Sequence, residues 1–132
     1  MDVRFLSGIV AGLAIGLVIS EALIAGAGLL LPEFDLATRF TGQGAPERMD
    51  FVVTALVYAL AAGLGATMAA AIAGPTAGGL CGMMWLVPFF LLGSLSNGGE
   101  LLSATMAIAG LGGTLLGIRL AVGCPHGPSK TD

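Results

Sequence analysis

The chain has few charged residues: 10% of its 132 residues are Asp, Glu, Lys or Arg. Ordinary soluble domains contain about 25% charged residues, so this chain cannot cover itself with polar surface. Its five basic residues stand singly and the formal net charge is -3. Because binding to nucleic acid or to anionic lipid heads needs a basic cluster, we exclude nucleic acid as a partner. The low content of charged residues instead leads us to expect that a lipid bilayer surrounds the chain.

The residue types that carry metal and redox chemistry are also scarce. The one histidine, His126, lies in the polar tail, which leaves no bis-histidine site for haem and no set of metal ligands. Cys81 and Cys124 lack CxxC spacing, and we interpret them as free thiols that behave as small apolar residues. No nucleophile, base and orienting group stand at a recognisable spacing. We therefore expect no enzyme, no catalytic residue, no metal and no cofactor.

Long apolar runs dominate what is present. Since about 20 apolar residues suffice to cross a bilayer, each run predicts a transmembrane helix. Pro32 ends the first run, Gly74 and Pro75 separate the second from the third, and Gly123 ends the last. The predicted fold is an all-α membrane protein, one domain of four transmembrane helices in an antiparallel bundle. Its expected parts are the spans 5–31, 51–74, 78–95 and 100–122, the polar loop 32–50 and the tail 123–132.

Local signals add detail to this plan. Pro88 lies inside the third span and predicts a kink there. Residues 34–40 have the mixed spacing of a short interfacial helix. Asn97 stands three residues before Glu100, as in a helix cap. A signal peptide is the alternative for the first run, but that run is too long for one and contains Glu21, so we interpret it as a helix.

The basic residues also bear on orientation. Four spans place both termini on one side, with Arg4, Arg119 and Lys130, and leave Arg39 and Arg48 on the other. Because cytoplasmic segments carry the excess of Lys and Arg, we expect an integral protein of a bacterial inner membrane with both termini in the cytoplasm.

Small residues recur every four positions in three of the runs. In lipid, where apolar contact alone gives little drive, such residues let helix backbones approach closely. This pattern predicts tight helix packing without naming the neighbour, which can be another helix of this chain, a second copy or a larger complex. The predicted packing positions are Gly8, Gly12, Gly16, Gly63, Gly113 and Gly117.

The first run carries a second small face. At about 100° per residue, Glu21 lies about 160° from the direction of Gly8, Gly12, Gly16 and Ser20. Ala14, Ala25 and Gly28 share the face of Glu21. A helix that is small on two sides indicates protein neighbours on both, so we expect self-association or other membrane subunits as partners.

Glu21 is the candidate for a polar site. It lies about 15 Å below the Leu31 end of its helix. A charge at such depth costs about 2.5 to 3.5 kcal/mol, which makes it a functional hypothesis that needs a partner. Tyr58 and Trp85 lie at a similar depth, with Thr54 or Thr105 within about a turn. We predict that Glu21, Tyr58 and Trp85 form any proton or cation site in the protein.

Two functions remain open on this basis. The first is a small non-enzymatic membrane protein that acts through helix packing, as an accessory subunit or a homo-oligomer. The second is a small proton- or cation-coupled transporter or channel, because charged and protonated carboxyl groups have comparable costs at this depth. A structural glutamate that only hydrogen-bonds to a neighbouring helix is the alternative to a functional one.

Overall fold

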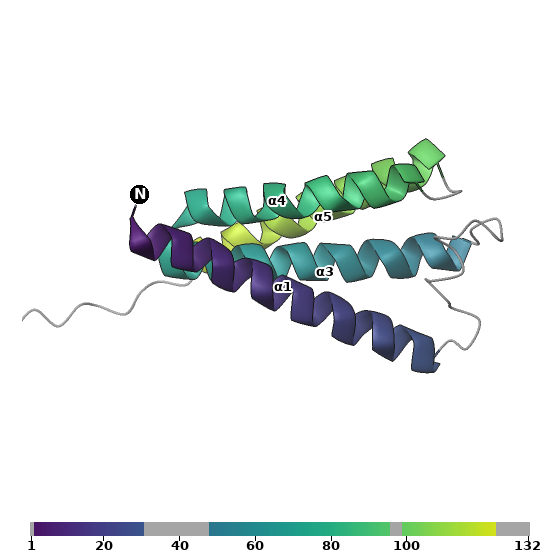
Figure 1. Cartoon of the computed structure of the whole chain (residues 1–132), viewed down its shortest axis with the longest axis horizontal. Helices are drawn as coiled ribbons and strands as arrows, with labels where there is room; N and C mark the ends of the chain where they lie inside the picture. The colour runs from purple at the N-terminus through teal and green to yellow at the C-terminus, as the bar shows by residue number, and fades with distance from the viewer. Residues whose placement is uncertain (1, 31–47, 96–98, 124–132) are drawn as a thin grey trace, which may run out of the picture.

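The chain folds as a bundle of four helices. The computed structural model describes residues 2–30, 48–95 and 99–123, and within these ranges it contains no strand. Successive helices run in opposite directions, so the start of α1 and the end of α5 lie at the same end of the bundle (Figure 1). The helices are α1 (Val3–Leu30), α3 (Arg48–Ala73), α4 (Pro75–Leu95) and α5 (Gly99–Gly123). The predicted helical membrane bundle is confirmed.

Three of the helices are long and apolar enough to cross a membrane: α1, α3 from Val52 and α5 from Ala104. The helix α4 has 21 residues and continues through Pro88; that it spans the membrane and bends at Pro88 stays a prediction. The predicted interfacial helix at 34–40 and the cap at Asn97 lie outside the described residues. The protein is a small helical membrane protein.

The turn between α3 and α4 is formed by a single residue, Gly74. Its φ is +91°, the only positive φ among the described residues. The Gly74 amide donates to the Ala70 carbonyl at 2.8 Å, and the Gly74 carbonyl accepts from Ala77 and Gly78. Glycine adopts this backbone conformation without the steric cost that a Cβ brings. Pro75 then serves as the first helical residue, so α4 begins three residues before the predicted Gly78.

Asp2 caps the start of α1. Its carboxylate accepts a hydrogen bond from the Arg4 amide at 3.3 Å, and its backbone carbonyl accepts from Phe5 at 2.9 Å. The first amides of a helix have no partner within the helix, and an aspartate at this position satisfies one of them. The start of α1 is therefore fixed locally.

The helix α3 is the centre of the bundle, because it packs against all three other helices and most extensively against α5 and α1. Many of its buried side chains are small, although Val57 and Tyr58 are buried too. Ala61, Ala62, Ala66 and Ala69 are fully buried. Since apolar contact with lipid is as good as with protein, close backbone packing has to supply the attraction between these helices.

Glycines stand where α3 and α5 meet. A Cβ at Gly63 would lie 3.0 Å from the Gly113 carbonyl oxygen, and one at Gly117 would lie 2.8 Å from the Thr67 hydroxyl and even nearer to the Gly63 carbonyl. The Thr67 hydroxyl donates to the Gly63 carbonyl within its own helix at 2.7 Å. Two backbones thus touch here with no side chain between them.

Neighbouring glycines of α5 give a matched test of this contact. A Cβ at Gly113 would lie 3.0 Å from Ala59 Cα and nearer still to its carbonyl, whereas one at Gly112 meets nothing within 4 Å. We expect Gly113→Ala to lower the free energy of unfolding by about 1–3 kcal/mol through overpacking. Gly112→Ala should leave it unchanged or raise it slightly, because alanine favours helix. Unfolding in mixed detergent micelles measures both, and equal effects would contradict the close α3–α5 contact.

Candidate functional site

One face of α1 packs into the bundle. We define the inner face as Gly8, Gly12, Gly16 and Ser20, all of which are buried. A Cβ at Gly12 would lie 2.5 Å from the Gly65 carbonyl oxygen of α3 and 2.9 Å from the Cys81 sulfur of α4. One at Gly8 would lie 2.8 Å from Ala73 Cβ. The inner face therefore holds α1 directly against the backbone of α3.

Trp85 fills the space left by two glycines. A Cβ at Gly16 would lie 2.6–2.7 Å from three atoms of the indole ring, and one at Gly65 would lie 3.4 Å from its nitrogen. Only 6% of Trp85 and 5% of Tyr58 is exposed, and both belong to the same buried cluster as Met106. Two of the three predicted site residues thus lie in the core.

The helix α1 diverges from α3 toward its C-terminal end (Figure 1). Ser20 is the last buried residue of the helix, and every residue from Glu21 to Leu30 is half-buried or exposed. At this depth large side chains take the place of the glycines on both helices. They are Leu23 on α1 and Tyr58 on α3. Because side-chain size sets the distance between packed helices, the close contact ends there.

Glu21 lies just past this point and is exposed. No other described residue forms a hydrogen bond or ion pair with it, although the Glu21 carboxylate lies within electrostatic range of the buried Tyr58 hydroxyl. The rest of its face is also exposed. We define the outer face of α1 as Ala14, Glu21, Ala25 and Gly28. The structure therefore leaves Glu21 at the surface of the bundle, whereas Tyr58 and Trp85 are buried.

This placement restricts what Glu21 can do. The side chain lies near the middle of a helix that is apolar enough to span the membrane. Ionisable groups at such depth face protein or a water-filled space, because acyl chains neither solvate a charge nor accept a hydrogen bond. An exposed Glu21 therefore needs a protein group or a water-filled space, outside the described part of the chain, that offers it a hydrogen bond. Whether it binds a proton or a cation with Tyr58 and Trp85 stays a prediction.

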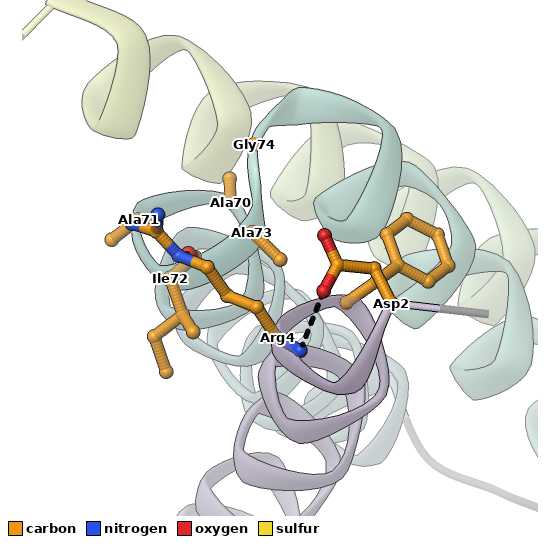
Figure 2. Close-up of a pocket in the computed structure, with 8 residues that line it drawn as sticks. Asp2, Arg4, Ala70, Ala71, Ile72, Ala73 and Gly74 are labelled. Carbon is orange, nitrogen blue, oxygen red and sulfur yellow. Dashed lines mark hydrogen bonds between the residues drawn. The ribbon is translucent and has the colours of Figure 1, made fainter.

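A second polar region lies at the end of the bundle where α1 begins. A cavity of about 590 Å³ is lined by Asp2, Arg4, Phe5 and residues 70–74. The Arg4 side chain extends along Ala71 and Ile72, with Asp2 on the other side of the cavity (Figure 2). The Arg4 Nε donates a hydrogen bond to the Ile72 carbonyl at 2.8 Å. The guanidinium thus binds the last turn of α3, where the helix dipole favours a cation.

The sequence did not point to this second region. Asp2 before an apolar run is a recognisable capping signal that could have placed the start of α1. The bond from Arg4 to Ile72 has no local signal, because it joins residues far apart in the chain. Within the described residues no three His, Cys, Asp or Glu side chains gather as metal ligands.

Comparison with known proteins does not identify a function, so the functional argument rests on the features described above. No protein-family model, no curated protein and no solved structure matches the chain.

The chain's one tryptophan makes the α1 contact measurable. We expect Gly16→Val to push the Trp85 indole out of its place, because a Cβ there meets the ring at 2.6 Å. The displaced ring should be quenched more strongly by lipids with brominated acyl chains. Gly26→Val is the matched control, since a Cβ at Gly26 meets nothing within 4 Å. Identical quenching in both variants would show that α1 does not pack on Trp85.

Proposed function

We propose that this small membrane protein acts by assembling with other membrane helices through the outer face of α1, as a homo-oligomer or as an accessory subunit. One observation carries the proposal: Glu21 is exposed on α1, a helix that is apolar enough to span the membrane. A neighbouring helix on this face would supply the hydrogen bond that acyl chains do not.

The packing of α1 within the chain supports the same proposal. The inner face is already used by α3 and α4, so it is not available to a partner. The outer face has small side chains at Ala14, Ala25 and Gly28 on either side of Glu21. These allow a second backbone to come close to the carboxyl group, as the glycines of the inner face do toward α3.

A proton- or cation-coupled carrier is the second candidate function. The observation that favours it is an exposed carboxyl group, Glu21, on a helix that is apolar enough to span the membrane, with the Tyr58 hydroxyl within electrostatic range. A carboxyl group there can meet a proton or cation without crossing the packed core. In this function Glu21 alternates between its charged and neutral forms during transport.

Bulky substitutions on α1 test the assembly. We expect Ala14→Trp to lower the mass of the particle toward that of the monomer, because the indole keeps a partner backbone away from the outer face. Ala22→Trp is the control, since Ala22 is also exposed but lies about 90° round the helix. Native mass spectrometry in mild detergent measures the mass. A monomer for the unsubstituted protein would contradict the proposal.

A Glu21→Gln variant tests the carrier function. Glutamine retains the size and hydrogen bonding of the side chain but cannot take up or release a proton. If Glu21 carries protons, we expect this variant to assemble normally and to lose pH-driven flux in liposomes. Flux equal to that of the unsubstituted protein would exclude a proton-carrying role, and Tyr58→Phe shows whether the neighbouring hydroxyl contributes.

A further inference from the structure

The outer face of α1 belongs to a longer regular pattern. Along α1 a small or polar residue recurs every seven positions. A second set, of aliphatic residues, also recurs every seven positions and is offset from the first set by three. The first set is Ser7, Ala14, Glu21 and Gly28, and the second is Val10, Leu17 and Ile24. Together they form a heptad repeat, the pattern by which two helices coil around each other with a left-handed twist. We call these seven residues the heptad seam.

The heptad seam is accessible along its whole length. Val10 is 58% exposed and Leu17 54% exposed, and of the seven residues only Ile24 is half-buried. The direction of the seam lies about 150° from the inner face, on the opposite side of the helix from α3. A second helix can therefore pack on the seam while α1 keeps its contacts with the bundle.

We propose that the seam binds the same seam of a second copy of this chain, so that two α1 helices form a parallel two-stranded coil with Glu21 opposite Glu21. This inference rests on the proposed assembly through α1 and names its partner. Copies inserted in one orientation have parallel α1 helices, and a two-fold axis along the membrane normal places each heptad position opposite itself. A second copy therefore brings its own carboxyl group to the same depth.

The pair of carboxyl groups provides a hydrogen-bonding partner that Glu21 does not find among the described residues of one copy. With one group protonated, its hydroxyl donates a hydrogen bond to the other group across the axis. Of the basic residues whose side chains the structure describes, Arg4 lies near the start of α1 and bonds to Ile72, and Arg119 lies near the end of α5. Both arginines lie far from Glu21 along the long axis of the bundle. The second copy therefore supplies the hydrogen-bonding partner that the described part of a single chain does not.

The remaining seam residues fit this arrangement. Ala14 and Gly28 lie one heptad on either side of Glu21, so the two backbones approach closely above and below the polar pair. Leu17 and Ile24 fill the alternate layers, where aliphatic side chains pack into the facing helix. An acidic residue among the inward positions favours one register of such a coil, because a shift by one heptad leaves each carboxyl group opposite Ala14 or Gly28.

Cysteine crosslinking tests the inference in native membranes. The background is the full chain with Cys124→Ser, in which Cys81 stays buried. Inward positions of a parallel coil bring equivalent Cβ atoms within disulfide range, so Ala14→Cys and Gly28→Cys should give a crosslinked dimer on mild oxidation. Ala22→Cys, exposed but outside the seam, should give little.

The outcomes separate this inference from the proposed function. Dimer at both seam positions and little at Ala22→Cys supports the α1–α1 coil. Crosslinks from the seam only to other proteins overturn the second copy as partner and leave the proposed assembly standing. Equal crosslinking at all three positions overturns the seam. Absence of any crosslink overturns both the inference and the proposed function.

Substitution of Glu21 tests the polar pair itself. Glu21→Gln should keep the crosslinked dimer at Ala14→Cys, because two amides can hydrogen-bond to each other. Glu21→Lys should lose it, since two ammonium groups repel and neither accepts a hydrogen bond. Unchanged quenching of Trp85 by brominated lipid shows that each variant is folded. Equal crosslinking in the lysine and glutamine variants would overturn the pairing.

Discussion

Close contact between helix backbones is the constraint on which this bundle depends. In lipid the transfer of apolar side chains between acyl chains and protein gains little, so attraction between helices comes from atoms packed at short range. The fully buried alanines of α3 and the glycines of α1 and α5 bring backbones into contact. Large side chains at these positions would hold the helices apart. The interior of this protein is accordingly rich in small residues beside a few large ones, such as Tyr58, Trp85 and Met106, and many other large side chains are exposed.

The same constraint explains where α1 leaves the bundle. The helix stays close to α3 as long as its inner face is Gly8, Gly12 and Gly16, with Trp85 from α4 in the space beside Gly16. Beyond Ser20 larger side chains follow and the contact ends. Glu21 therefore stands at the boundary between the packed and the free part of α1. Both proposed functions depend on this position, because a carboxyl group inside the contact could meet neither a partner nor a proton.

Much of the fold follows from sequence, because the rules involved are local. Runs of apolar residues give the helices, and Gly74 followed by Pro75 gives the turn between α3 and α4. Heptad or four-residue spacing also shows which residues share a face. Local rules do not show which faces meet, so the burial of Tyr58 and Trp85 and the exposure of Glu21 required the three-dimensional arrangement. The bond from Arg4 to Ile72 depends on tertiary packing in the same way.

The divergence of α1 makes the protein wider at one end than at the other (Figure 1). At the end where Arg4 binds the last turn of α3, α1 lies close against α3. At the opposite end α1 stands apart, so the protein displaces more lipid area in that leaflet.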